Sequence, residues 1–119
     1  MAMDFKQSET KTNLMRAFAG ESQARNRYTF AASQANKQGL YVIEHVFKFT
    51  ADQEKEHAQV FYEQLKELAG ENIEADGSYP VDINPNISEL LKMAQHNEYQ
   101  EHDDVYLHFA QKAQEEGFG

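Results

Sequence analysis

Apolar positions recur at alternating intervals of three and four along two long segments of the chain. In residues 10–38 this stripe consists of Leu14, Phe18, Glu21, Arg25, Tyr28, Ala32 and Ala35. In residues 40–68 it consists of Phe47, Thr50, Glu54, His57, Phe61 and Leu68. This periodicity is typical of amphipathic helices that pack in a bundle. We therefore expect two long helices, each with polar side chains in the middle of an inward stripe.

The residues at the segment ends support these boundaries. Ser8 or Thr10 can cap the first helix, and Gly39 is suited to end it. Because the second helix follows almost at once, the two form an antiparallel hairpin. Residues 69–86, which contain both prolines, form a linker long enough to cross the length of a bundle.

A third helix is expected over residues 87–116. Asn86 and Glu89 have the spacing of a capping box at its start. Its inward stripe consists of Ile87, Leu91, Ala94, Glu98, Glu101 and Val105.

The third helix repeats features of the first. Tyr28 and Tyr106 each precede a glycine by eleven residues, and Ala32 and Ala110 occupy matching places. No second copy of residues 40–68 follows Gly117. We therefore expect an all-α bundle in which this chain supplies three helices and lacks the fourth.

Acidic residues lie on all three inward stripes. They are Glu21, Glu54, Glu98 and Glu101, and His57 accompanies them. A buried carboxylate without a partner is costly, so these side chains need a counter-charge. Glutamates from several helices, combined with a Glu-x-x-His pair, are the ligands of dinuclear metal sites in bundle cores. The pattern predicts such a site.

Each of these residues also has a simpler interpretation. An inward glutamate can be a salt-bridge partner, for example Glu21 with Arg25, and a single Glu-x-x-His is common on helices. Tyr28 and Tyr106 can be ordinary core aromatics. The coincidence of acids near the middle of three stripes favours the metal site over these alternatives.

Composition restricts the remaining possibilities. The 119 residues suffice for one small domain, and the absence of cysteine excludes disulfides, zinc-thiolate sites and iron–sulfur clusters within this chain. The formal net charge of −9 argues against nucleic-acid binding. No apolar run approaches the ~20 residues needed to cross a membrane, and no secretory signal is visible, so we expect a cytoplasmic protein.

Four stretches also resemble the ferritin-like domain of rubrerythrins. These are "AFAGESQARNRY", "TADQEKEHA", "EYQEHDDVY" and "FAQKAQEEGF". The similarity runs from about Thr10 to Phe118. It implies a ferritin-like four-helix bundle with a non-haem diiron centre.

Carried over residue by residue, the resemblance implies a set of metal ligands. These are Glu21, Glu54, His57, Glu98 and Glu101. Tyr28 and Tyr106 match tyrosines that hydrogen-bond near the ligating carboxylates. The chain departs from the family in lacking a fourth-helix Glu-x-x-His pair and a four-cysteine rubredoxin-like site.

The resemblance further implies a peroxidase that reduces hydrogen peroxide to water with two iron ions and an external electron donor, such as a rubredoxin-type protein. Manganese or zinc can also occupy carboxylate-rich sites. The alternatives are a ferroxidase or iron-handling protein, and an inactive metal-binding bundle fragment. We expect a homodimer or higher homo-oligomer, with or without exchanged helices, in which a second chain completes the bundle.

Overall fold

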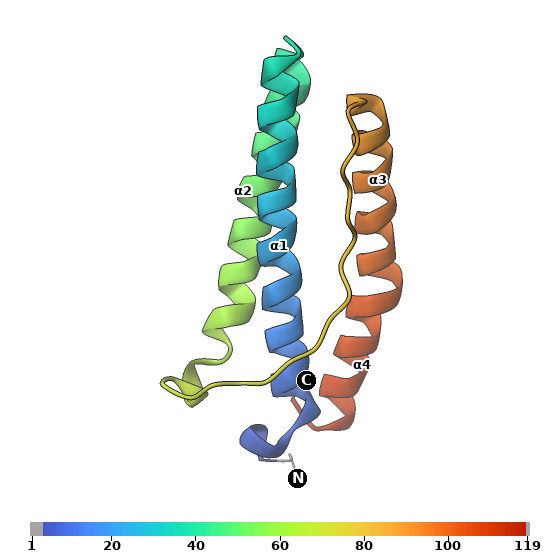
Figure 1. Ribbon diagram of the computed structural model, residues 1–119. Helices are drawn as coiled ribbons and strands as arrows, with labels where there is room; N and C mark the ends of the chain where they lie inside the picture. Colours follow the sequence, from blue (N-terminus) through green and yellow to red (C-terminus); the bar gives the residue numbers. More distant parts are fainter. Residues whose placement is uncertain (1–3, 119) are drawn as a thin grey trace.

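The computed structural model describes residues 4–118, apart from the side chains of His102 and Asp103. The expected domain bounds at residues 1 and 119 lie outside this range. All regular elements in the described range are helical, which confirms the all-α prediction (Figure 1). They are η1 (Phe5–Gln7), α1 (Glu9–Lys37), α2 (Tyr41–Glu63), η2 (Lys66–Leu68), α3 (Ile87–Gln100), η3 (Glu101–Val105) and α4 (Tyr106–Glu115).

The two longest helices, α1 and α2, form an antiparallel hairpin. The side chain of Ser8 caps α1 by accepting a hydrogen bond from the backbone N–H of Lys11 at 3.2 Å. Gly39 makes the turn into α2 with a φ of 73°, which an L side chain rarely adopts. Alanines dominate the interface, and small side chains there allow the two helices to lie close together.

The α-helical part of the second segment is shorter than the sequence predicted. We expected one helix to residue 68, but α2 ends at Glu63 and the backbone tightens into η2. Leu65 donates its N–H to Tyr62 O at 3.0 Å, and Leu68 donates to Leu65 O at 2.9 Å. Leu65 and Leu68 are both buried, so the tighter turns place both leucines in the core.

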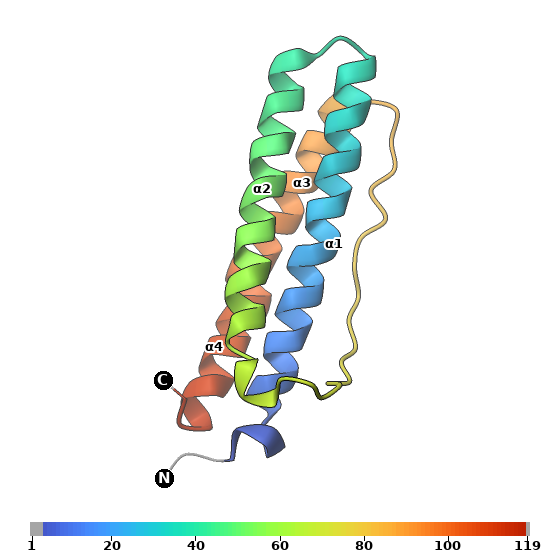
Figure 2. The same cartoon turned by 90° about the vertical axis from the view of Figure 1, so that its left-hand side faces the viewer.

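The third segment forms one continuous rod, but it is not a uniform α-helix as expected. Residues Glu101–Val105 form a turn of π-helix between α3 and α4. A π-turn is wider than an α-turn and usually accommodates one additional residue. The rod lies beside α1 in Figure 1 and behind the α1–α2 hairpin in Figure 2, and both α3 and α4 contact α1.

Residues 69–86 form the crossover from η2 to α3, which we call the strap. Four side chains on one face of α1 hold it: Arg16 binds Asp76, Arg27 binds Asp82, Gln34 binds the carbonyl of Asn84 and Gln38 binds the carbonyl of Pro85. The strap therefore runs parallel to α1 along most of its length (Figure 2).

The strap has almost no slack. Arg16 lies on α1 and Gln38 is the residue that caps its end; they are 22 residues apart, which corresponds to about 33 Å at 1.5 Å per residue. Their partners Asp76 and Pro85 are only nine residues apart, and nine residues reach about 32 Å when fully extended.

The carboxylate of Glu116 joins the end of the rod to the start of α1. It accepts hydrogen bonds from the backbone N–H groups of Glu9 and Thr10, at 2.9 and 2.7 Å, and from the Thr10 hydroxyl. Burial raises the pKa of Glu116, but these hydrogen bonds outweigh burial and hold the pKa below its usual value. A negative charge also suits the positive end of the α1 dipole.

Within the described residues, no helix is both long enough and apolar enough to span a membrane. The cytoplasmic location stays a prediction.

Candidate metal centre

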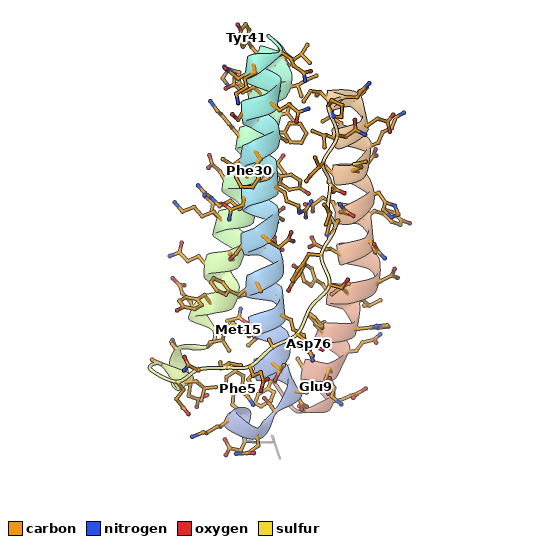
Figure 3. The ribbon with its side chains drawn as sticks, in the orientation of Figure 1. Phe5, Glu9, Met15, Phe30, Tyr41 and Asp76 are labelled. Atoms are coloured by element: carbon orange, nitrogen blue, oxygen red, sulfur yellow. The ribbon has the colours of Figure 1, made fainter. Side chains whose placement is uncertain are left out.

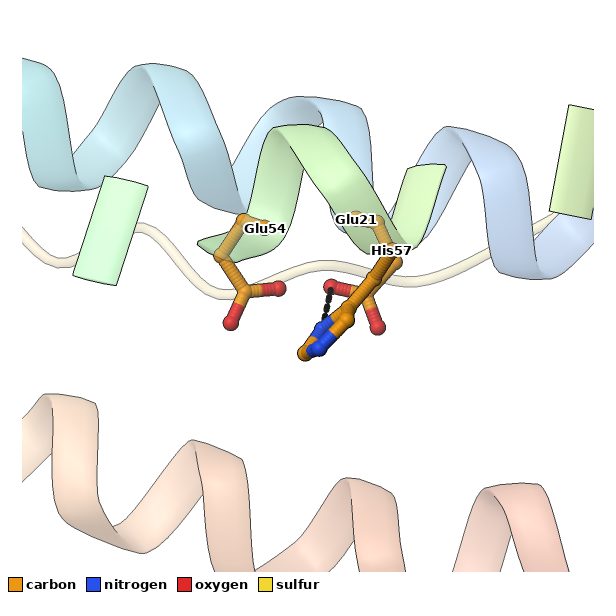
Figure 4. Close-up of side chains that lie close together, drawn as sticks. All are labelled: Glu21, Glu54 and His57. Carbon is orange, nitrogen blue, oxygen red and sulfur yellow. Dashed lines mark ion pairs between the residues drawn. The ribbon is translucent and has the colours of Figure 1, made fainter. Parts of the chain in front are cut away.

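Three of the predicted ligands come together where α1 and α2 face each other. Glu21 projects from α1, and Glu54 and His57 project from successive turns of α2 (Figure 4). Each offers one ligand atom, and these atoms all lie within 4.8 Å of one another. The distance from His57 Nδ1 to Glu21 Oε2 is 3.8 Å.

The rod supplies a second group of ligands. Glu98 lies on α3 and Glu101 is the first residue of the π-turn. Their carboxylates and that of Glu54 again have oxygen atoms within 4.8 Å of one another. Glu54 therefore belongs to both groups and would be available as a ligand to a metal ion in either one.

Two buried oxygen atoms in this centre have no hydrogen-bond partner in the described part of the chain. They are Glu21 Oε2 and Glu54 Oε2, and both side chains are only 3% exposed. A buried acceptor without a donor is destabilising, whereas a divalent cation satisfies it. The oxygen-rich ligands with one imidazole suit iron, manganese or zinc. The residues present therefore fit a metal site.

Two tyrosines connect α1 with the rod, because each donates a hydrogen bond to a carboxylate on the other element. Tyr28 on α1 donates its hydroxyl hydrogen to Glu98 Oε1 at 2.9 Å, and Tyr106 on α4 donates to Glu21 Oε1 at 2.7 Å. The Glu21 carboxylate thus has one oxygen fixed by a phenol, while its second oxygen faces His57. Such outer hydrogen bonds orient metal ligands.

The π-turn allows both of these hydrogen bonds to form. Glu21 and Tyr28 are seven residues apart, which brings them onto one face of α1, but Glu98 and Tyr106 are eight apart. The wider turn absorbs the additional residue and returns Tyr106 to the face that carries Glu98. The sequence prediction missed this turn, although the unequal spacings in the two repeats were a signal for it.

Burial determines the protonation of Glu21 in the metal-free protein. It raises the pKa of Glu21 to about 7, against the opposing effect of the Tyr106 hydrogen bond and with a contribution from the charge of Glu98. Burial also raises the pKa of Tyr28 and of Tyr106, and neighbouring carboxylates, chiefly Glu98 and Glu101 respectively, add to the effect. Both phenols therefore stay protonated and act as donors.

Two expectations from the sequence turn out differently in detail. His57 lies on the inward stripe, yet its side chain is 53% exposed because nothing in the described chain packs on that side. Arg25, considered as a salt-bridge partner of Glu21, does not take that role: Tyr106 and His57 are the neighbours of the carboxylate. The Nε atom of Arg25 is buried with no partner in the described residues.

Comparison with known proteins now decides the family. The rubrerythrin family model matches residues 12–119. The chain belongs to the rubrerythrin family. It is 46% identical to a rubrerythrin of Clostridium perfringens over 114 residues and 47% identical to that of Porphyromonas gingivalis over 118 residues. It is 41% identical to a rubrerythrin of Nitratidesulfovibrio vulgaris over 113 residues.

These matches cover 95%, 99% and 95% of this chain but 58% of each of the three relatives. Membership of the rubrerythrin family supports a non-haem iron protein with a ferritin-like helical bundle. Because the chain spans only part of the relatives, the activity, substrates and partners of a whole rubrerythrin are proposals for it.

Proposed function

We propose that this chain forms a non-haem diiron centre that reduces hydrogen peroxide to water. The observation that carries the proposal is the position of Glu54, which is buried and belongs to two ligand groups at once. Two iron ions held there supply two electrons when they are ferrous. Hydrogen peroxide accepts two electrons and two protons, its O–O bond breaks, and two water molecules form.

The residues of the chain would perform distinct tasks in this reaction. Glu21 and His57 would hold one metal ion, Glu98 and Glu101 would hold the other, and Glu54 would be shared by both groups. The carboxylates neutralise positive charge in a buried setting, which favours the binding of two cations at close range.

The phenols of Tyr28 and Tyr106 keep the carboxylates in place through their hydrogen bonds. Because both phenols remain protonated, they hold a proton at a fixed position beside the ligands. We propose that the electrons that restore the ferrous state come from an external donor such as a rubredoxin-type protein.

The choice of oxidant separates this proposal from a ferroxidase. We expect the anaerobically iron(II)-loaded protein to be oxidised faster by hydrogen peroxide than by an equal concentration of dioxygen, at one peroxide for every two ferrous ions. Stopped-flow absorbance of the ferric product measures both rates. Faster oxidation by dioxygen would support iron handling instead. Well under one metal ion per chain after loading would support an inactive fragment.

We also propose that a second copy of the chain covers the exposed side of the centre. His57 is half-exposed there, and α2 carries a further apolar stripe whose members, Val42, Val46, Phe49 and Val60, are exposed. In an alternative arrangement two α1–α2 hairpins pair about a twofold axis, and two copies of Glu21, Glu54 and His57 form a symmetric site without Glu98 and Glu101. We expect sedimentation at micromolar concentration to show a dimer or larger species; a monomer would contradict the arrangement.

A further inference from the structure

A cavity lies beneath the strap and reaches the metal centre from the side opposite His57. Its volume is about 550 Å³, and its walls come from α1, the strap and the rod. Glu101 and Tyr106, which respectively belong to and support the ligand set, are among its lining residues. Asp76, labelled in Figure 3, also lines it. The cavity therefore connects the outside of the bundle with the ligands.

Gly20 forms the inner end of this cavity. A Cβ atom placed on Gly20 would lie 4.0 Å from Glu101 Oε1 and 4.0 Å from Tyr106 Oη. The same Cβ would lie 3.7 Å from Cε1 of Tyr79 on the strap. A larger side chain at this position would fill the space between the Tyr79 ring and the two groups of the centre. The missing side chain of Gly20 thus keeps a path open.

The ring of Tyr79 folds back over Gly77, and Tyr79 is 42% exposed. A Cβ atom on Gly77 would lie 2.6 Å from Cζ and 2.9 Å from Cε2 of Tyr79, so a side chain at position 77 would displace the end of the ring. Ion pairs secure the strap three residues to either side: Asp76 with Arg16 and Asp82 with Arg27. Asp82 also accepts a hydrogen bond from Asn97 of α3 at 2.7 Å.

The charges around the cavity favour the entry of an uncharged molecule. Arg16 and Arg27 line it, and each is paired with an aspartate of the strap, so the outer part has little net charge. The outer part of the cavity therefore offers little electrostatic attraction to a cation or an anion.

We propose that the cavity beneath the strap is the access route for a small uncharged oxidant, and that Tyr79 sets the size of oxidant that reaches Glu101 and Tyr106. This inference rests on the proposed function, because that function makes hydrogen peroxide the substrate. Tyr79 determines specificity here by occupying space; it takes no part in the electron or proton transfer.

Replacing Tyr79 with alanine tests the size limit. In the iron(II)-loaded protein we expect the rate constant with tert-butyl hydroperoxide, relative to that with hydrogen peroxide, to rise about tenfold, which is ~1.4 kcal/mol in barrier height. The Tyr79→Phe variant keeps the ring and should keep the native ratio. Tyr41→Ala removes an exposed tyrosine at the far end of the hairpin and is the matched control (Figure 3). An unchanged ratio in Tyr79→Ala would overturn the proposal.

A binding measurement tests the route independently of peroxide reduction. In the anaerobic iron(II)-loaded protein, the association rate of nitric oxide, which is small and uncharged, should rise in Tyr79→Ala and fall about tenfold in Gly20→Val, equivalent to ~1.4 kcal/mol. Absorbance follows the binding. Equal rates in both variants and the native protein would mean that small molecules reach the centre by another route, and would overturn the proposal. If native protein fails to react with peroxide while nitric oxide follows the expected order, the proposed function fails and the route stands.

Discussion

Replacement of Glu54 with leucine is expected to abolish metal binding and, at the same time, to stabilise the metal-free protein. Glu54 contributes to both ligand groups, so its loss leaves neither group with three ligands. Metal analysis after anaerobic iron(II) loading should show a fall to background, and peroxide should no longer produce the ferric absorbance. Substitution of any other single ligand removes a member of only one group and should have a smaller effect.

The stabilising effect has a separate physical cause. Glu54 is 3% exposed and its Oε2 atom has no hydrogen-bond partner in the described chain. Leucine has a similar volume and removes both the buried polar atom and its repulsion from neighbouring carboxylates. Replacing buried charges with apolar side chains often stabilises proteins by about 1–4 kcal/mol.

Urea unfolding of the metal-free proteins measures this gain in the free energy of unfolding. Glu56 provides the matched control, because it lies two residues away on α2 and is exposed. Glu56→Leu should change neither the metal content nor, to any large extent, the stability. A Glu54→Leu protein that still binds two metal ions, or that unfolds more readily than the native protein when metal-free, would contradict our account of the centre.

The stability of the metal-free protein should fall as the pH rises from about 4.5 to about 7. The pKa of Glu21 is raised from 4.5 to about 7 in the folded state. Below pH 4.5 both states carry the proton, but between these values only the folded state keeps it, so deprotonation of the unfolded chain pulls the equilibrium towards unfolding. The upper limit of the loss is roughly 3 kcal/mol, and the curve should level off above pH 7.

Comparison with Glu21→Gln isolates this effect, because glutamine has nearly the same shape and no proton to lose. The variant should show a flatter dependence of the unfolding free energy on pH between 4.5 and 7. Glu44, Asp76 and Glu116 have pKa values below their usual range, so their contributions are lost only at lower pH. A native protein with constant stability across this window would show that Glu21 titrates normally.

The periodicity of the sequence was informative wherever helices pack along their length. It placed Glu21 and Glu54 inward, and both are buried, because a spacing of three and four residues fixes one face of a helix. It could not show how far His57 would be exposed, because exposure depends on which helix covers that side. The periodicity also did not reveal the π-turn, because the effect of this turn depends on the contact between Tyr106 and Glu21, which is 85 positions away.

The strap was the part least accessible to sequence analysis. It has no periodic pattern, and its conformation depends on partners far away in the chain, such as Arg16 with Asp76. The proximity of the Tyr79 ring to Gly20 and Gly77 becomes evident only in the folded structure. Residues that act through packing between irregular segments leave little trace in the spacing of apolar positions.

Because the strap is almost fully extended, its length determines the position of α3 along α1. With nine residues stretched beside 22 residues of α1, the contour length between Asp76 and Pro85 limits how far α3 can slide along its neighbour. A deletion in this segment would shift α3 along α1 and move Glu98 away from Glu21. An insertion could instead form a bulge in solvent and leave α3 in place. Tolerance to changes of length in this crossover should therefore be one-sided.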